Sequence, residues 1–260
     1  MTLNKMKIFI IIIFCLTSSC AIGPLKIPAP SRYLDYQTQA SLQFPLKGES
    51  IITWGGRTLE ENYHAVSKSQ RFALDIAGVA EGTVPLTQEE IDEAKKSRDK
   101  KSSAFSLMLQ GDPKKNESCF CYGREVMAPA DGVVVYAKDG IADNIPGKIP
   151  FIVRLKSIFM WGNAGNNVVI NHGNNEYSFF AHLKQNSIKV KIGQKIKSGD
   201  TVGECGNSGT SLGPHLHYNL QNSTNWRFGS SLPAQFNNYY ANGKLVNRGE
   251  PVQGQIIISK

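Results

Sequence analysis

The sequence lacks an apolar run long enough to cross a bilayer as a helix, which takes roughly 20 consecutive apolar residues. Charged residues make up a moderate 19% of the chain and apolar residues 41%, a balance that excludes wholesale disorder. Acidic residues are fewer than basic ones, 21 against 29, so the formal net charge is +8 and anionic partners are favoured. Among these, nucleic acid is not expected, because no stretch interleaves aromatic and basic residues. An anionic membrane surface and a cell-wall polymer remain.

The N-terminus has the order of a secretory signal peptide over residues 1–20. Lys5 and Lys7 precede the short apolar run Ile8–Leu16, which small residues and Cys20 follow. The alternative is a membrane anchor that stays uncleaved. LTSSC resembles a bacterial lipobox, in which the cysteine is lipidated, although its leucine lies four residues before the cysteine rather than three. We therefore expect an exported protein of the cell envelope, with Cys20 as the candidate point of membrane attachment.

Cysteine is scarce, and three cysteines follow the leader: Cys119, Cys121 and Cys205. Export would allow them to oxidise. One intervening residue makes a bridge between Cys119 and Cys121 awkward, whereas either of them could pair with Cys205. The Cys-x-Cys pair lacks the two-residue spacing of zinc knuckles, so we interpret it as structural.

Composition divides the chain after the leader into three parts. The proline-containing residues 21–45 are expected to form a tether, residues 46–221 the domain, and residues 222–260 an extension that packs back on it. An insertion at about 81–118 interrupts the domain. Its capping-box pattern at Thr87–Glu90 predicts a polar helix through residue 110, on a solvated surface rather than as a lid over a site.

The rest of the domain is rich in short β-branched and aromatic runs separated by Gly, Asn and Lys turns. This pattern predicts a mainly β fold with an antiparallel β-sheet core, sandwich or barrel-like, and little helix. The predicted strands are 51–54, 71–76, 126–136 with a turn at 129–132, 167–171, 177–183, 187–190 and 201–203.

The chain has five histidines, and two of them, His215 and His217, flank one leucine after a Gly/Ser-rich loop. In a strand, residues i and i+2 point to the same face, so the two imidazoles lie side by side. This predicts a metal site or an acid–base pair. A phosphate-binding loop is not indicated, because no Lys-Ser/Thr follows the glycines. His172, in an Asn-His-Gly turn, is expected to be structural.

A zinc hydrolase needs three protein ligands, an open coordination position and a nearby group that moves a proton. His64, Asp75 and His182 are the remaining candidates beside His215 and His217. Ten residues separate His64 from Asp75, enough for a loop that returns the chain to one site. Sequence distance alone does not bring these side chains together.

The motifs that contain these residues, taken in order, resemble the lysostaphin/LytM-type zinc metalloendopeptidases over about residues 50–221. The similarity is greatest to the subgroup with a longer gap between the first His and the Asp. The matching motifs are NYH (62–64), QRFALDI (70–76), MAPADGVVV (127–135), NHG (171–173), FAHL (180–183), VKIGQKIKSGDTVGECGNSG (190–209) and PHLH (214–217).

The resemblance implies a lysostaphin-like antiparallel β core of the duplicated hybrid motif (barrel-sandwich) type. It implies an enzyme that cuts peptide bonds in peptidoglycan stems or cross-bridges. By the same resemblance His64, Asp75 and His217 hold one Zn²⁺, while His182 and His215 flank the attacking water as base and as electrostatic support.

Two rival interpretations remain. A non-catalytic relative could bind wall peptides or activate another hydrolase, although such proteins typically lose ligands that this chain retains. The stretch 190–203 is similar to the hairpin of lipoyl and biotinyl carrier domains, but it lacks their exposed lysine in a tight turn.

Overall fold

The computed structural model describes residues 27–85, 87, 89–90, 107–151, 153, 164–226 and 228–259. The predicted signal peptide over residues 1–20, with Cys20, and residues 91–106 of the predicted helix lie outside the described residues. Within the described part of the chain, no helix has the length and apolarity needed to cross a membrane.

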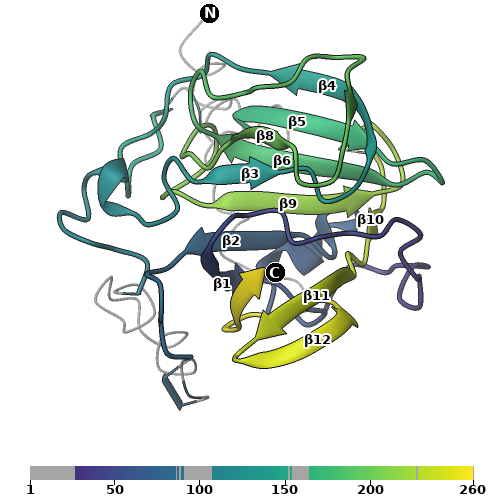
Figure 1. Ribbon diagram of the computed structural model, residues 1–260, viewed down its shortest axis with the longest axis horizontal. Coiled ribbons are helices and arrows are strands. Elements are labelled where there is room, and N and C mark those ends of the chain that lie inside the picture. The colour runs from purple at the N-terminus through teal and green to yellow at the C-terminus, as the bar shows by residue number, and fades with distance from the viewer. Residues whose placement is uncertain are drawn as a thin grey trace, which may run out of the picture.

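Nearly all regular structure in the described residues is β-strand (Figure 1). The main sheet has the order β12-β11-β13-β1-β2-β9-β6-β5-β4-β7 with β10 paired to β9, and β3 and β8 form a separate pair. Every strand pairing is antiparallel, which confirms the predicted fold class. The strands are β1 Glu49–Trp54, β2 Leu74–Gly78, β3 Glu125–Met127, β4 Gly132–Lys138, β5 Asn166–Asn171, β6 Tyr177–Leu183, β7 Lys195–Ile196, β8 Thr201–Glu204, β9 Leu216–Gln221, β10 Ser231–Leu232, β11 Phe236–Ala241, β12 Lys244–Gly249 and β13 Ile256–Ser259. Three short 3₁₀ turns complete the set: η1 Tyr63–Val66, η2 Lys68–Gln70 and η3 Asn116–Ser118.

Two predicted strands differ from the structure. Residues 71–73 belong to a turn before β2, in which the Ala73 N–H donates to the carbonyl of Gln70. Residues 187–190 form no strand, because the Asp139 carboxylate accepts the N–H groups of Asn186 and Ile188 and holds the chain in a loop.

The capping box of the insertion is confirmed at Thr87 and Glu90. The Glu90 carboxylate accepts the Thr87 N–H at 2.7 Å, and the Thr87 hydroxyl accepts the Glu90 N–H at 3.3 Å. The far end of the predicted helix is wrong, however. Residues 107–110 are not helical, since Leu109 forms a β-bridge with Cys119 instead.

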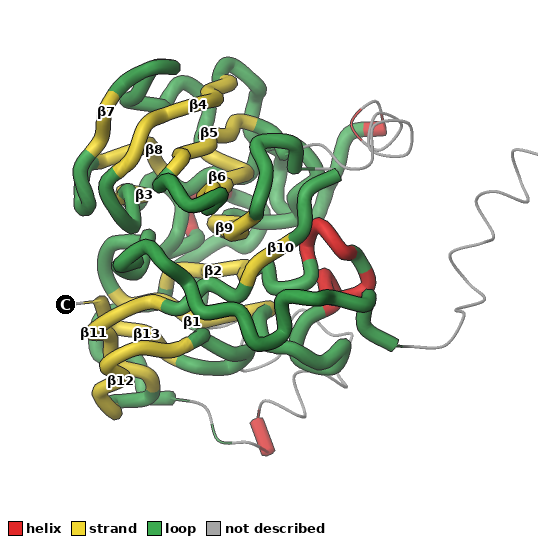
Figure 2. The backbone as a smooth tube through the Cα atoms, turned by 90° about the vertical axis from the view of Figure 1, so that its right-hand side faces the viewer, coloured by secondary structure: helices red, strands yellow, loops and turns green. Residues whose placement is uncertain are grey.

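The alternation of β9 separates the core from the face that carries the candidate site. Leu216, Tyr218 and Leu220 are fully buried in the main hydrophobic cluster, which the β3–β8 pair closes with Val126 and Val202. Burying each such side chain contributes about 1.5–3 kcal/mol. Figure 2 shows β3 and β8 on one side of β6 and β9, and helical turns beside β10 on the other. The polar residues of β9 face these turns.

Both ends of the described chain pack on the sheet. Leu42 and Phe44 are buried in the main cluster, and Leu42 bridges to Phe236 of β11. This part of residues 21–45 therefore packs on the domain, in contrast to the tether expected from its prolines. At the other end β13 pairs with β1, so residues of the C-terminal extension lie in the main sheet.

A buried carboxylate holds the N-terminal segment in place. Glu176, which has no exposed surface, accepts hydrogen bonds from the Tyr36 hydroxyl at 2.8 Å and from the N–H groups of Gln39 and Ala40 at 2.6 and 2.7 Å. Hydrogen bonds to a charged acceptor stabilise a fold more than neutral ones, and a buried donor left without a partner is costly. Glu176 thus joins residues 36–40 to the β5–β6 turn.

The Glu176→Ala variant should lower the free energy of unfolding by about 3 kcal/mol, because it leaves three donors without their acceptor. Urea denaturation measures the loss, and limited proteolysis should cut earlier within residues 27–45. Glu60→Ala, at an exposed position, is the control and should change stability by less than about 0.5 kcal/mol. A loss below about 1 kcal/mol for Glu176→Ala would show that the segment is held mainly by other contacts.

Candidate metal centre

The candidate site begins with a row of residues across three neighbouring strands. Asp75 of β2 lies opposite His217 of β9, and His217 lies opposite Ala181 of β6. Leu74 and Ile76 on either side of Asp75 are buried in the main cluster, so alternation turns the Asp75 carboxylate to the opposite face. The sheet register therefore places a carboxylate and an imidazole side by side.

His64 reaches the same place from the turn η1. Asn62 caps this turn: its Oδ1 accepts the His64 N–H at 3.1 Å, and its amide donates to the carbonyls of Gly56 and Ala73. Asn62 is fully buried, so these bonds fix the start of η1 against the segment that leads into β2. The local sequence NYH thus holds the backbone of His64 in a fixed position beside β2.

A single carboxylate oxygen lies among three imidazole nitrogens. Asp75 Oδ1 is 2.8 Å from His217 Nδ1, 3.1 Å from His64 Nε2 and 3.6 Å from His215 Nε2. His64, Asp75 and His217 each offer one ligand atom, and these three atoms lie within 4.8 Å of one another. The three side chains are 6–12% exposed. The structure therefore brings the three predicted ligands together.

The electrostatics of the cluster favour an ionised Asp75 carboxylate beside a neutral His217 ring. Burial alone would raise the pKa of Asp75, but His64, His215 and His217 together lower it well below its ordinary value. Burial lowers the pKa of His217, although the Asp75 carboxylate opposes this shift. Such a set of donors carries one negative charge and can neutralise part of a bound cation.

His182 joins the site through an irregularity in β6. Strict alternation would turn its side chain toward the core, like that of Phe180. The β5–β6 register shifts at this point, however, so that two steps along β5 correspond to three steps along β6, from Phe180 to Leu183. His182 adopts a φ of 62°, and its N–H donates to the carbonyl of Ala164. This bulge re-aims the side chain toward the row of Asp75 and His217.

The two remaining histidines have matching hydrogen bonds. His182 Nδ1 lies 2.8 Å from the carbonyl of Ser208, and His215 Nδ1 lies 2.8 Å from the carbonyl of Gly213. Each Nδ1 therefore carries the proton, which leaves Nε2 of the neutral ring as an acceptor. The His182 ring centroid is 5.0 Å from that of His215 and 5.8 Å from that of His217. Burial and then the two neighbouring rings hold the pKa of His182 well below its ordinary value.

The hydrogen bonds of His217 test whether these residues fit a metal ion. Its Nδ1 faces Asp75 Oδ1 and its Nε2 faces Gln70 Oε1, both at 2.8 Å, yet a neutral ring has one N–H for two acceptors. In addition, buried His64 Nε2 lies 3.1 Å from Asp75 Oδ1 but forms no hydrogen bond. A cation shared by His64 Nε2, Asp75 Oδ1 and His217 Nδ1 would account for both the missing N–H of His217 and the unbonded nitrogen of His64. Two imidazoles with one carboxylate are also a donor set that zinc uses, and they leave one coordination position open. The residues fit zinc.

Sequence reasoning missed two residues beside the ligands. Tyr63 packs its ring on that of His64, with centroids 4.0 Å apart, and its hydroxyl lies 3.4 Å from Asp75 Oδ2. Gln70 contacts His217. Their signal lay in the NYH and QRF motifs, where only the histidine and the aspartate have an obvious metal chemistry.

A groove of about 230 Å³ runs along the cluster. Its described lining has no Asp, Glu, Lys or Arg side chain; beside the site residues it is lined mostly by apolar and amide side chains. The lining residues are Tyr63, His64, Gln70, Ala164, Asn167, Phe179, Phe180, Ala181, His182, Thr210, His217, Asn219 and Trp226. His172 lies outside the groove lining, where Asp131 and Ser178 satisfy its two ring nitrogens, which matches its predicted structural role.

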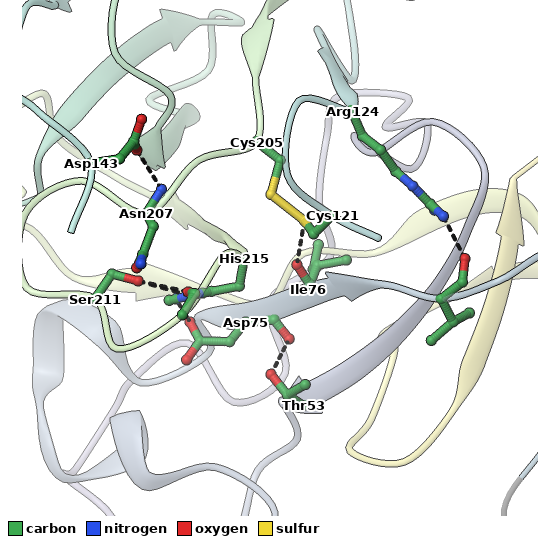
Figure 3. Close-up of a disulfide and its surroundings, with 12 residues drawn as sticks. Thr53, Asp75, Ile76, Cys121, Arg124, Asp143, Cys205, Asn207, Ser211 and His215 are labelled. Atoms are coloured by element: carbon green, nitrogen blue, oxygen red, sulfur yellow. Dashed lines mark hydrogen bonds and ion pairs between the residues drawn. A yellow bond between two sulfur atoms is a disulfide. The ribbon is translucent and has the colours of Figure 1, made fainter. Parts of the chain in front are cut away.

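A disulfide borders the site on the side of the core. Cys121 pairs with Cys205, one of the two predicted alternatives, and Cys119 is free. Cys121 Sγ contacts the carbonyl of Ile76, the residue after Asp75. On the other side of the bond, the carbonyl of Gly206, next to Cys205, accepts the His215 N–H. Figure 3 shows the disulfide beside Asp75 and His215. The bond therefore links the two segments that flank the cluster.

A buried cluster of two imidazoles and a carboxylate, with two more imidazoles beside it on an antiparallel sheet, defines a candidate metallohydrolase centre. Residues 119–228 match the family model described as Peptidase family M23. This match includes His182, His215 and His217, while His64 and Asp75 lie before it.

Curated relatives match shorter stretches. The chain is 51% identical over 57 residues to the peptidoglycan DD-endopeptidase ShyA of Vibrio cholerae, covering 22% of this chain and 13% of that protein. It is 33% identical over 96 residues to ShyC of the same organism, covering 37% of this chain and 19% of the relative. The matches thus span less than a fifth of either relative. Among solved structures, a zinc-containing peptidase from Vibrio cholerae aligns with a TM-score of 0.29 at 17% identity, over 67% of this chain and 48% of its own.

The double variant Cys121→Ala/Cys205→Ala should lower the free energy of unfolding by up to about 4–5 kcal/mol, because the bond closes a loop with a sequence separation of 84. Chemical denaturation of the variant and of the oxidised protein measures the difference. Cys119→Ala is the matched control and should leave the unfolding midpoint unchanged. Burial raises the pKa of Cys119 to about 11, so this thiol is a poor nucleophile for exchange with the disulfide at neutral pH. Equal stability of the double variant and the control would refute a stabilising role for the bond.

Proposed function

We propose that the protein is an exported zinc-dependent endopeptidase that hydrolyses peptide bonds in peptidoglycan stems or cross-bridges. The observation that carries the proposal is the convergence of ligand atoms of His64, Asp75 and His217 within 4.8 Å, beside His182 and His215. The M23 family match and the DD-endopeptidase relatives support the substrate class.

In this proposal His64, Asp75 and His217 would hold the zinc ion through Nε2, Oδ1 and Nδ1, respectively. Two neutral imidazoles and one carboxylate leave a net charge of about +1 on such a centre. When bound there, zinc would lower the pKa of a water molecule toward neutrality and polarise the peptide carbonyl.

The two other histidines would handle the proton and the developing charge. His182 is held neutral with Nε2 as acceptor, so it would take a proton from the attacking water. His215 donates its Nδ1–H to the carbonyl of Gly213, and the ring held in this way would give electrostatic support to the tetrahedral intermediate. The backbone carbonyls fix both rings, which is the preorganisation that such catalysis needs.

The groove is consistent with a neutral stretch of peptide. Phe179, Ala181 and Trp226 form apolar parts of its described lining, where charged side chains are absent. A substrate segment with small uncharged side chains on both sides of the cleaved bond fits this surface. Glycine-containing cross-bridges and alanine-containing stem peptides both meet this description.

Export and attachment to the envelope form part of the proposal. The predicted signal peptide over residues 1–20 would direct the chain out of the cytoplasm, with Cys20 as the candidate lipid attachment site. The buried disulfide between Cys121 and Cys205 supports an oxidising compartment. Without Lys5 and Lys7 of the leader the formal net charge falls from +8 to +6, which would still favour contact with anionic wall polymers.

His217→Ala and Asp75→Ala should lose zinc and peptidase activity together, because each removes one of three protein ligands. The purified chain should contain about one zinc ion, measured by atomic absorption after zinc-replete purification. His172→Gln, at a histidine outside the cluster, is the control and should keep its zinc. Absence of zinc from the wild-type chain would overturn the proposal in favour of a non-catalytic wall-binding relative.

His182 variants should separate binding from chemistry. His182→Ala should keep its zinc and lose peptide release from purified peptidoglycan by about 10²–10⁴-fold, because the general base is gone. His182→Asn is the second variant, since asparagine tolerates the positive φ that this position requires. If both variants cut as fast as the wild type, His182 is not the base.

A further inference from the structure

The segment between His64 and Asp75 is fixed to the strand that carries His217. The Ser69 carbonyl accepts hydrogen bonds from the side-chain amides of Asn219 at 2.8 Å and Gln221 at 2.5 Å. The Phe72 N–H donates to the hydroxyl of Ser231 in β10 at 3.0 Å. Because His217, Asn219 and Gln221 share one face of β9, these bonds dock the turn η2 on the row that contains His217.

This docking brings one side chain of η2 to the metal cluster. Gln70 is the last residue of η2, and its Oε1 lies 2.8 Å from Nε2 of His217. On the other side of the same ring, Nδ1 lies 2.8 Å from Asp75 Oδ1. His217 is thus held between an uncharged acceptor and the carboxylate.

We propose that Gln70 is a positioning residue that keeps the His217 proton on Nε2 and so leaves the Nδ1 lone pair for the metal ion. The proposal rests on the zinc centre proposed above. A histidine that ligates a metal usually donates its other ring N–H to an acceptor, which fixes the tautomer and the ring orientation. Here that acceptor is a glutamine from the ten-residue gap between the first two ligands.

The physical reason is a competition between two tautomers. With the proton on Nδ1, His217 would donate to Asp75 Oδ1 and close the cluster with a hydrogen bond between two of the ligands. With the proton on Nε2, the ring donates to Gln70, and Nδ1, Asp75 Oδ1 and His64 Nε2 are all lone-pair donors to one point. Gln70 therefore shifts the balance from an internal hydrogen bond toward a cation site.

An uncharged acceptor also suits the chemistry. Glutamate at position 70 would accept the same proton but add a negative charge beside the centre, which reduces its ability to polarise a carbonyl. Glutamine orients the ring and leaves the net charge of about +1 on the zinc donor set.

The test compares the zinc affinity of the full chain, measured by chelator competition, with that of two Gln70 variants, a control variant and His217→Ala. Gln70→Met keeps the length of the side chain and removes the acceptor, and its zinc dissociation constant should rise by about 10–100-fold. Gln70→Glu keeps an acceptor at this position, so its zinc dissociation constant should stay within about threefold of the wild-type value while kcat falls. Gln194→Leu is the matched control, because Gln194 is also half-buried and accepts one N–H, that of Lys191, near β7; its affinity should not change.

A second measurement keeps the test decisive if Gln70→Met folds poorly. In the zinc-loaded wild type, the His217 Nε2–H should give a slowly exchanging resonance in ¹⁵N-histidine NMR spectra. The proton should stay protected in Gln70→Glu and exchange rapidly in Gln70→Ala. An unprotected Nε2 proton in the wild type would overturn the proposal.

His217→Ala separates the two levels of failure. If His217→Ala loses zinc and Gln70→Met binds it as tightly as the wild type, the role of Gln70 is wrong and the zinc centre stands. If His217→Ala also binds zinc normally, the zinc centre itself is wrong.

Discussion

The site depends on the register of three antiparallel strands. Asp75, His217 and Ala181 form one row across β2, β9 and β6. A shift of one residue in any of these strands would turn every side chain of that strand to the opposite face, because the side-chain period is two. The residues that fix the register are apolar: Leu216, Tyr218 and Leu220 lie in the core on one face of β9, so that its polar residues must lie on the other. Core packing and placement of the ligands are therefore one constraint.

Regular strands alone do not complete the cluster, and two departures from regularity supply the rest. His182 reaches the groove because a bulge and a positive φ turn its side chain away from the core. Such a conformation costs on the order of 1–3 kcal/mol and persists where the surroundings determine it. Here the Ala164 carbonyl holds its N–H and the Ser208 carbonyl holds its ring. His64 comes from a 3₁₀ turn that begins at the buried cap Asn62. The Asn62 side chain accepts the His64 N–H and donates its own amide N–H to the carbonyl of Gly56.

The parts of the site that follow a simple period could be predicted from sequence. His215 and His217 share a face because they are two residues apart, and the strand over residues 177–183 has the predicted bounds. His64, Asp75 and His182 could be selected through motif resemblance, because no spacing rule gives the distance between them. Their proximity comes from long-range register and from a bulge, neither of which leaves a signal in a local window.

Other features depended on interactions that local sequence does not encode. The predicted strand over residues 187–190 is a loop because Asp139, distant in sequence, accepts the N–H groups of Ile188 and of the preceding Asn186. The prolines of residues 21–45 suggested a tether, yet Leu42 and Phe44 complete the core. Gln70 was overlooked because a glutamine has no metal chemistry of its own; its significance comes from the ring nitrogen opposite its side chain.

The boundaries of the family match bear on how the centre is assembled. Residues 119–228 contain His182, His215 and His217, whereas the two other ligand candidates, His64 and Asp75, precede this stretch. The earlier segment is nevertheless part of the same sheet, since β2 pairs with β9 and Ser69 accepts amide donors of β9. It therefore supplies two of three ligand candidates and the acceptor for the third. A metal centre built from these candidates would belong to both segments, and the hydrogen bonds between them hold its residues together.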